Sequence, residues 1–328
     1  GVQTCALPIF KITVNFITVL YIAIVGCAGL AGVCAFDIGR NLGIVVMICV
    51  AFVAAIYYLI THYITFQTCQ LNEVTLTIPK LPESLKGKKI ALISDLHMDT
   101  KRNCITDSLL EEAVNTIVSA KPDAIFLLGD LLDKEFEAME DLYDAFDRLS
   151  TIAPVLAVYG NHDYVGGNPS TLNDSLLEHG VTIIPNGYAA KLFDKIDVIG
   201  IDDLEQVSFN PSILQCYSNR QDENGEYKPL FVITHNPESI NHMKQYPIDC
   251  LFAGHTHGTQ VCSPTGVPVL KLMSKLPNPF WWSPKLKAKM EAVLKMKYIY
   301  GHYEEPCTTE NMNINVFVTA GVGSHGGI

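Results

Sequence analysis

The segment 254–258 places His255 and His257 one residue apart, directly after the apolar run 250–253. Alternate residues of an extended segment point to opposite faces of it. Where the backbone turns at the end of a strand, however, both rings can lean toward one cavity. Histidine is the commonest metal ligand among the side chains. The pair therefore suggests a metal site, and two hydrogen-bonded core histidines are the alternative.

The same pattern, an apolar run that ends in Asp, Asn or His, recurs upstream. The runs 89–94, 124–128, 155–159, 197–201 and 230–233 are followed by Asp95-Leu96-His97, Gly129-Asp130, Gly160-Asn161-His162-Asp163, Asp202-Asp203 and Thr234-His235. Each group alone has an ordinary explanation: Asp130 could cap a helix, Asn161 could form a turn, and His235 could be a core histidine. Their joint occurrence favours one shared site, because sites in α/β folds form outside the carboxyl ends of the strands.

The elements that must position these groups can be predicted from the apolar patterning. Amphipathic helices are expected at about 106–120 and 135–149, an edge strand at 74–78, and a last strand at 316–320. The continuous apolar runs suit strands that are covered on both faces. Strands that alternate with helices predict an α/β fold with largely parallel or mixed sheets.

Seven of the strand-end side chains have the chemistry of metal ligands: Asp95, His97, Asp130, Asn161, His235, His255 and His257. This set is too large for one four-coordinate ion and suits two ions that share a carboxylate. Mixed imidazole, carboxylate and amide ligands fit Mn, Fe or Zn better than Ca or Mg. Two such ions can activate a shared water and stabilise both the attacking and the leaving oxygen of a displacement.

His162 does not fit the ligand count and suggests a catalytic role. Beside a ligating Asn161, it could contact a phosphoryl oxygen or protonate the leaving group, and Asp163 could orient its ring. We therefore expect His162 and Asp163 to be the catalytic residues.

Composition limits the class of protein. The chain has 328 residues, 48% hydrophobic residues and a net charge of −11, which allow one large globular domain and an additional segment. A non-specific nucleic-acid binder is usually basic, so we expect no nucleic-acid binding beyond a nucleotide as substrate. The 10 cysteines form no Cys-x-x-Cys pair, which argues against a thiolate zinc site; free thiols would suit a reducing compartment.

Residues 10–61 have the pattern of a transmembrane helical hairpin. The runs 10–36 and 42–60 are almost wholly apolar, and each is near the ~20 residues that cross a bilayer. A polar turn containing Asp37 and Arg40 separates them. We expect a multi-pass protein of the cell membrane, and lysines after the hairpin favour a cytoplasmic catalytic domain. A buried hairpin of a soluble domain is the alternative, but neither run has a polar face.

These segments give a predicted domain organisation. Residues 1–9 fit nothing that follows and are expected to be a non-native or disordered lead, before the transmembrane helices of 10–61. Residues 62–87 are a linker with an edge strand, and 88–328 form the catalytic domain. Both ends of the chain are expected to be incomplete.

The five motif blocks Asp-x-His, Gly-Asp, Gly-Asn-His-Asp, His and Gly-His-x-His, in this order, resemble the calcineurin-like metallophosphoesterase superfamily from about residue 88 to 323. The segment 77–82 and the transmembrane lead resemble its membrane-associated YaeI/YkuE-type branch. The resemblance implies a four-layer α/β/β/α sandwich. Thr259 stands where that branch often has a second glycine, and the chain stops where the family continues with a further strand.

The resemblance also implies an assignment of the site residues. One ion would take Asp95, His97, Asp130 and His257, and the other would take Asp130, Asn161, His235 and His255. Asp130 would bridge the two ions, and His162 would be the catalytic histidine.

The stretch 271–297 resembles a basic amphipathic element that can lie on a membrane surface. Phe280, Trp281 and Trp282 are followed by five lysines with apolar residues between them. Because it follows the histidine pair, it could line the substrate entrance. A solvated helix with an ordinary packed face is the alternative.

Together these observations predict a membrane-anchored phosphoesterase with two divalent metal ions. It would hydrolyse phosphodiester or pyrophosphate bonds of a lipid-linked or nucleotide substrate by attack of a metal-bridging hydroxide, with manganese expected first and iron or zinc as alternatives. A phosphomonoesterase or protein phosphatase of the same fold is the second hypothesis. An inactive membrane scaffold is the third, and the presence of every ligand position argues against it.

Overall fold

The computed structural model of the chain describes residues 2–6, 69–101, 104–259, 291 and 294–323. The transmembrane hairpin predicted at 10–61 lies outside these ranges, as does most of the amphipathic stretch 271–297. Within the described ranges, no helix has both the length and the hydropathy needed to cross a bilayer.

The first of two six-stranded sheets carries the earlier site motifs. Its strands are β1 (Val2–Ala6), β2 (Gln70–Val74), β3 (Ile90–Ile93), β4 (Ala124–Leu128), β5 (Val155–Val158) and β6 (Val181–Ile183), in the order β2-β1-β3-β4-β5-β6. Strands β1, β3, β4, β5 and β6 are parallel, and β2 runs antiparallel to β1. Every residue of β3, β4 and β5 is buried, as predicted from their continuous apolar sequences.

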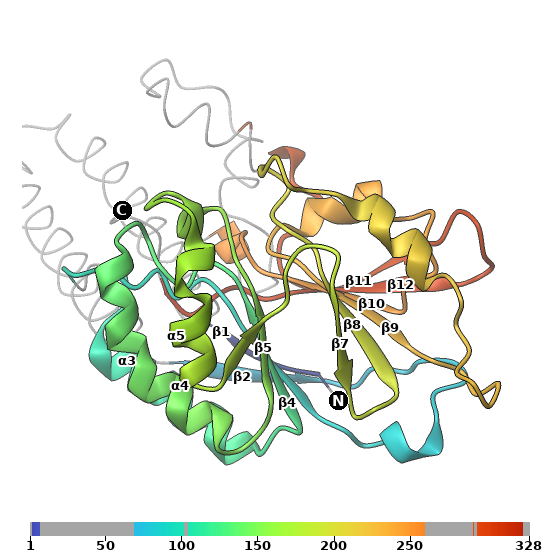
Figure 1. Ribbon diagram of the computed structural model, residues 1–328, viewed down its shortest axis with the longest axis horizontal. Helices are drawn as coiled ribbons and strands as arrows, with labels where there is room; N and C mark the ends of the chain where they lie inside the picture. Colours follow the sequence, from blue (N-terminus) through green and yellow to red (C-terminus); the bar gives the residue numbers. More distant parts are fainter. Residues whose placement is uncertain (1, 7–68, 102–103, 260–290, 292–293, 324–328) are drawn as a thin grey trace, which may run out of the picture.

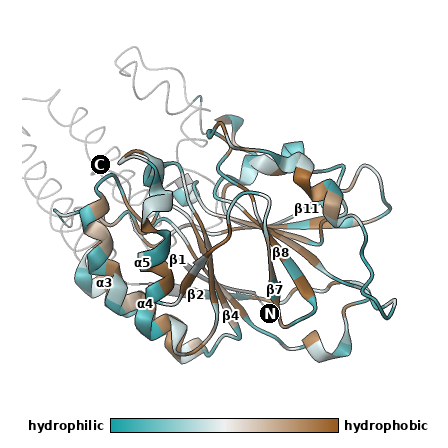
Figure 2. Ribbon diagram, in the orientation of Figure 1, coloured by the Kyte–Doolittle hydropathy of each residue, from teal (hydrophilic) through white to brown (hydrophobic). Residues whose placement is uncertain are grey.

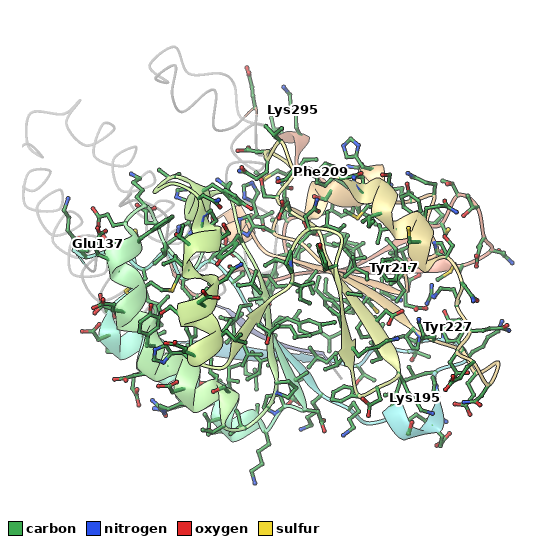
Figure 3. The ribbon with its side chains drawn as sticks, in the orientation of Figure 1. Glu137, Lys195, Phe209, Tyr217, Tyr227 and Lys295 are labelled. Carbon is green, nitrogen blue, oxygen red and sulfur yellow. The ribbon has the colours of Figure 1, made fainter. Side chains whose placement is uncertain are left out.

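The second sheet carries the later motifs. It consists of β7 (Ala189–Leu192), β8 (Ile196–Gly200), β9 (Leu230–Ile233), β10 (Cys250–Ala253), β11 (Gly301–Pro306) and β12 (Asn313–Val318), in the order β11-β12-β10-β9-β8-β7. The four inner strands are parallel, and the two edge strands are antiparallel to their neighbours. In Figure 3, Lys195, which precedes β8, lies toward the lower edge, and Phe209, which follows β8, lies toward the upper edge.

Three hydrophobic clusters hold the layers together. The middle cluster packs the two sheets face to face through residues such as Phe126, Phe231 and Phe252. Helices α3 (Asp107–Ala120), α4 (Tyr143–Ser150) and α5 (Asn173–Glu178) cover the outer face of the first sheet. The 3-10 helices η6 (Pro211–Tyr217) and η7 (Pro237–His242) cover the second. Figure 2 shows the resulting contrast between apolar strands and hydrophilic outer helix surfaces. The chain therefore has an α/β fold with parallel and mixed sheets.

One of the two predicted helices is confirmed and the other is divided in two. Helix α3 is confirmed, and the Thr106 hydroxyl caps it by accepting a hydrogen bond from the Leu109 amide at 3.2 Å. The helix predicted at 135–149 is split into the 3-10 helix η3 (Phe136–Leu142) and α4. The acidic residues Glu137, Glu140 and Asp141 lie at helical spacings where like charges disfavour an α-helix.

The beginning of the first sheet differs from the prediction. The edge strand lies at Gln70–Val74 rather than 74–78, because the pairing partner of these residues is β1. Residues 1–9 were expected to be a non-native or disordered lead; Val2–Ala6 form β1 between β2 and β3, and the non-native origin stays a prediction. Residues 2–6 form a strand because they hydrogen-bond to β2 on one side and to β3 on the other, and no local sequence pattern reveals this pairing.

The cysteines of the described ranges divide into two kinds. Cys216, Cys250 and Cys307 are free, as expected. Cys69 is disulfide-bonded, against the expectation of free thiols. The reducing compartment inferred from the cysteines therefore stays a prediction.

Candidate active site

The turns that follow β3, β4 and β10 hold an unusual backbone conformation. Five of the seven expected ligands are non-glycine residues with positive φ: Asp95 at 55°, His97 at 47°, Asp130 at 52°, His255 at 70° and His257 at 47°. Residues with side chains rarely adopt this region, and such strained positions cluster at functional sites. The strained turns point to a functional site at the carboxyl ends of the strands.

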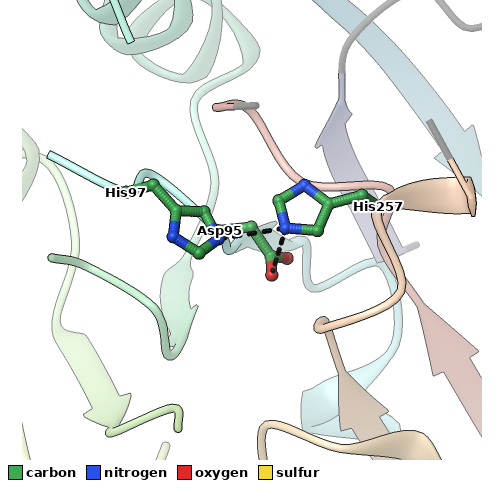
Figure 4. Close-up of side chains that lie close together, drawn as sticks. All are labelled: Asp95, His97 and His257. Atoms are coloured by element: carbon green, nitrogen blue, oxygen red, sulfur yellow. Dashed lines mark hydrogen bonds and ion pairs between the residues drawn. The ribbon is translucent and has the colours of Figure 1, made fainter. Parts of the chain in front are cut away.

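One group of ligating atoms comes from Asp95, His97 and His257, which lie within 4.8 Å of one another (Figure 4). The Nε2 atoms of His97 and His257 are 3.0 Å apart, and His257 Nε2 lies 3.5 Å from Asp95 Oδ1. The Asp95 and His97 side chains are fully buried. Two imidazole nitrogens and a carboxylate oxygen thus face a common point, with His257 partly exposed to solvent.

A second group comes from Asp130, His235 and His255, with Asn161 beside it. His235 Nε2 lies 3.1 Å from Asp130 Oδ2 and 3.2 Å from His255 Nδ1. The Asn161 Oδ1 atom lies 3.1 Å from the same His255 nitrogen. The two neighbouring histidines of segment 254–258 therefore belong to different groups.

Asp130 connects the two groups. Its Oδ2 atom lies 3.1 Å from His235 Nε2 and 3.4 Å from His97 Nε2. Its Oδ1 atom accepts a hydrogen bond from the His162 amide at 2.8 Å. The carboxylate is thus fixed by the backbone on one side and faces a histidine of each group on the other.

The electrostatics suit cation binding. Burial and the charge of His235 lower the pKa of His255 to about 4, and burial lowers the pKa of His257 to about 4. Burial raises the pKa of Asp130, but His235 and His97 outweigh it and hold that pKa well below its usual range. Ionised carboxylates and neutral imidazoles are the forms that bind metals.

His97 and His235 differ from His255 and His257. Burial lowers the pKa of His97, but Asp133 and Asp130 outweigh burial and raise it. The pKa of His235 is raised further. Burial lowers its pKa, but the charges of Asp130 and Asp95 outweigh burial and raise that pKa to about 10. Its Nδ1 atom lies 2.7 Å from the Leu128 carbonyl oxygen, which fixes the ring with Nε2 toward Asp130. The negative charge that raises this pKa is the charge that a bound cation would neutralise.

His162 lies at the edge of both groups, but its partner is not the predicted one. Its Nδ1 atom lies 3.1 Å from the backbone carbonyl oxygen of Asp133, its hydrogen-bond partner, and 3.1 Å from Oδ1 of the same residue. Its ring meets the His97 ring edge-on with centroids 4.7 Å apart. Asp133 Oδ1 also lies 3.6 Å from His97 Nδ1. Hydrogen bonding by His97 and the charge of His162 lower the pKa of Asp133 to about 2. The residue that orients His162 is therefore Asp133.

Asp163 has a structural role instead of the predicted orienting role. Its two oxygens accept hydrogen bonds from the Leu132 amide at 2.9 Å and the Gly160 amide at 2.8 Å. Burial and the nearby charge of Asp130 raise its pKa to about 7. The side chain joins the turn after β4 to the turn after β5.

The role of Asp133 was missed because it does not directly follow an apolar run. It lies three residues after Asp130 in Gly129-Asp130-Leu131-Leu132-Asp133. This spacing was the available signal, because the turn brings both carboxylates back to the same edge of the sheet.

A family model now explains this arrangement. The model of the calcineurin-like phosphoesterase family matches residues 88–259, which contain every strand-end group described above. The chain belongs to the calcineurin-like phosphoesterase family. It is accordingly a metal-dependent phosphoric ester hydrolase.

Curated relatives fall in the same family. The uncharacterized metallophosphoesterase YkuE of Bacillus subtilis is 27% identical over 64% of this chain and 72% of its own length. The UDP-2,3-diacylglucosamine pyrophosphatase LpxG of Chlamydia trachomatis is 25% identical over 60% of this chain and 71% of its own. The phosphodiesterase YaeI of Escherichia coli is 29% identical over 54% of this chain and 63% of its own.

The residues present fit the divalent ions that the family implies. Imidazole nitrogens and carboxylate oxygens approach one another to 3.0–3.5 Å in both groups, and the buried carboxylates Asp95 and Asp130 provide negative charge. Such a convergence of ligating atoms is stable when a cation lies among them.

Proposed function

We propose that this protein hydrolyses phosphodiester or pyrophosphate bonds with the help of two divalent metal ions. The observation that carries the proposal is the position of Asp130 Oδ2, 3.4 Å from a histidine of one group and 3.1 Å from a histidine of the other. A carboxylate so placed can serve two ions at once, whereas a single-ion site would leave half of the ligating atoms unused.

The ligands divide between two positions. Asp95, His97, Asp130 and His257 would hold one ion, and Asp130, Asn161, His235 and His255 would hold the other. Bound there, the ions would supply positive charge to the phosphoryl group and lower the pKa of a coordinated water. Manganese is our first choice of metal, with iron and zinc as alternatives of similar ligand preference.

His162 is the side chain that we assign to the substrate. The backbone carbonyl and the carboxylate of Asp133 both lie 3.1 Å from its Nδ1 atom, so this side of the ring is held and the Nε2 atom is left for the reacting group. There it would contact a phosphoryl oxygen or give a proton to the leaving group. The edge-on contact with His97 keeps the ring beside the metal positions.

Two relatives support a diester or pyrophosphate substrate over a monoester. One is named as a pyrophosphatase that acts on a diacylated sugar nucleotide, and another is named as a phosphodiesterase. Together with the apolar segment 10–61, the first name favours a lipid-linked substrate for this chain as well.

Membrane anchoring by residues 10–61 is part of the proposal. Strands β1 and β2 pair antiparallel with Ala6 opposite Gln70, so the chain leaves the first sheet and returns to it at neighbouring points (Figure 1). A hairpin with two crossings begins and ends on one side of the membrane, which matches this geometry. We propose the cytoplasmic side, from the lysines at 80–89. After extraction of membranes with alkaline carbonate, the full chain should stay in the pellet; release into the supernatant would contradict the anchor.

Parallel assays with two esters test the activity. The full chain loaded with Mn²⁺ should hydrolyse bis(p-nitrophenyl) phosphate faster than p-nitrophenyl phosphate. His162→Ala and Asp130→Asn should both lose this activity, and Glu226→Gln, an exposed acid on the opposite edge of the second sheet, should retain it. Faster hydrolysis of the monoester would contradict the proposal and show that the protein is a phosphomonoesterase. Wild-type activity in Asp130→Asn would contradict the two-ion site.

A further inference from the structure

The end of strand β8 contains one strand-end motif that the proposed metal ligands leave unexplained, Asp202-Asp203. The Asp203 side chain is fully buried. Its Oδ1 atom accepts a hydrogen bond from the Glu205 amide at 2.9 Å. Its Oδ2 atom is also buried and has no hydrogen-bond partner in the described part of the chain. A buried carboxylate oxygen without a partner destabilises a fold unless positive charge compensates it.

The backbone places Asp203 beside the second group of ligands. Strand β8 pairs parallel with β9, and the Ile201 amide donates to the Ile233 carbonyl at 3.0 Å. One residue further, the Thr234 hydroxyl donates to the Asp202 carbonyl at 3.4 Å. Asp202 and Asp203 therefore follow β8 at the level where His235 and Asn236 follow β9.

No lysine or arginine among the described residues forms an ion pair with Asp203. Burial raises the pKa of Asp203, the charge of His235 lowers it, and the charge of Asp130 raises it. Both nitrogens of His235 already have partners, at the Leu128 carbonyl and the Asp130 carboxylate. The described residues therefore offer Asp203 no lysine or arginine as countercharge, and a cation bound beside His235 would provide one.

We propose that Asp203 is a positioning residue of the metal centre, whose buried carboxylate compensates the charge of the ion held by Asp130, Asn161, His235 and His255. It acts through these ligands rather than by contact with substrate. The negative charge raises the affinity for the second ion and costs stability when that ion is absent. The inference rests on the two-ion site of the proposed function.

Asp197, at the other end of the same strand, is a matched control. It is equally buried, but its two oxygens form ion pairs with Lys191, at 2.6 Å, and with Lys228. Asp197 thus has its countercharges within the protein, whereas Asp203, just after the same strand, has no lysine or arginine of the described ranges beside it. Their replacements should have opposite effects on the metal-free protein.

The test compares Mn²⁺ binding by calorimetry and thermal unfolding of the metal-free full chain. Asp203→Asn keeps the acceptor for the Glu205 amide and removes the charge. It should weaken binding of one of two Mn²⁺ ions about 10- to 100-fold and leave the metal-free Tm unchanged or higher. Asp197→Asn should lower the metal-free Tm and leave both affinities unchanged. Asp203→Ser, which keeps a hydroxyl acceptor, should repeat the loss of affinity.

Wild-type affinities in both Asp203 variants would overturn the inference and leave the two-ion site intact. A metal-free Tm that falls in Asp203→Asn as far as in Asp197→Asn, with unchanged affinities, would overturn it as well, because it would make Asp203 purely structural. A wild-type chain that binds no Mn²⁺ would contradict the proposed function itself.

Discussion

Two aspartates near His162 have different tasks, and their contacts show which is which. Asp133 lies 3.1 Å from the His162 ring and also approaches His97, so it joins the proposed catalytic histidine to a proposed ligand. Asp163 accepts two backbone amide hydrogen bonds and has no such contact. Sequence position favoured Asp163, because it directly follows His162. Only tertiary contacts, which fix the direction of each side chain, show that Asp133 and not Asp163 lies against the His162 ring.

These contacts predict opposite phenotypes for the two aspartates. Asp133→Asn should lower kcat about 10- to 100-fold with little change in the Tm. It removes the negative charge beside the His162 and His97 rings and leaves His162 only the backbone carbonyl of residue 133. Asp163→Asn should lower the free energy of unfolding by about 1–3 kcal/mol, because an amide cannot accept both backbone hydrogen bonds. Steady-state kinetics and urea unfolding of both variants measure this. A stable Asp163→Asn with reduced kcat would return the orienting role to Asp163.

Glu305 gives a pH-dependent contribution away from the site. Burial raises its pKa, but hydrogen bonds from Lys244 and Lys297 outweigh it and lower that pKa from an ordinary 4.5 to about 2. A depressed carboxyl pKa stabilises the fold fully above pH 4.5, and this contribution disappears as the pH falls toward 2.

Glu305→Gln should therefore destabilise the protein by about 1–3 kcal/mol at pH 6 and by less at pH 3. Urea unfolding of the metal-free chain and the variant at both pH values measures the difference. A difference that stays constant between the two pH values would show that the lysines do not depress this pKa.

At the scale of elements, the turns after the strands are packed too closely for ordinary side chains. A Cβ atom at Gly160 would lie 2.2 Å from Asp130 Oδ1. At Gly129, with φ +89°, it would lie 2.5 Å from the Gly160 amide nitrogen. The two glycines let the turns after β4 and β5 approach until Asp130 and Asn161 face the same histidines. The turns are thus as important to the site as the ligands.

Gly160→Ala should consequently displace Asp130 and reduce the bound Mn²⁺ from two ions per chain to one or none. Elemental analysis after dialysis measures the ratio. Gly225→Ala is the control for the added Cβ, because no atom lies within 4 Å of it. Its φ of +79° makes the control the more strained backbone position of the two, since Gly160 has no positive φ. Equal metal content in both variants would show that the site tolerates the displacement.

Much of this element-level arrangement could be predicted from the sequence. Strands buried on both faces appear as continuous apolar runs, so the ends of β3, β4, β5, β9 and β10 and their polar residues were visible. The left-handed turns at Asp95 and His257 were not, because only surrounding packing enforces a strained backbone. The position of β2 was missed because its pairing partner β1 decides it. The division of 136–150 into two helices was missed because the apolar pattern was followed and the like charges of Glu137, Glu140 and Asp141 were not.

At the scale of the whole molecule, the two sheets bring distant parts of the chain to one edge. Sheet one contributes Asp95, Asp130 and Asn161, and sheet two contributes His235 and the two histidines of segment 254–258. The cluster between the sheets, with Phe126 and Phe252 packed edge to face at 5.4 Å, fixes their relative position. Strand β1 extends the first sheet from the beginning of the chain.

Strand β1 should be essential to this sheet. Thr4 pairs with Asn72 on one side and with Leu92 on the other, so Thr4→Pro removes a hydrogen-bond donor between two strands. The Tm of the full chain should fall by several degrees, whereas Thr4→Val, which favours strands, should leave it unchanged. Thermal unfolding by circular dichroism decides this. An unchanged Tm in Thr4→Pro would show that residues 2–6 do not contribute to the fold.

The central claim is that two metal ions share Asp130. A crystal structure of the Mn²⁺-loaded chain, with data collected near the manganese absorption edge, tests it most directly. The account predicts two anomalous peaks about 3.5–4 Å apart, one beside Asp95, His97 and His257 and the other beside Asn161, His235 and His255, with Asp130 between them. A single peak, or a pair of peaks that Asp130 does not touch, would contradict it.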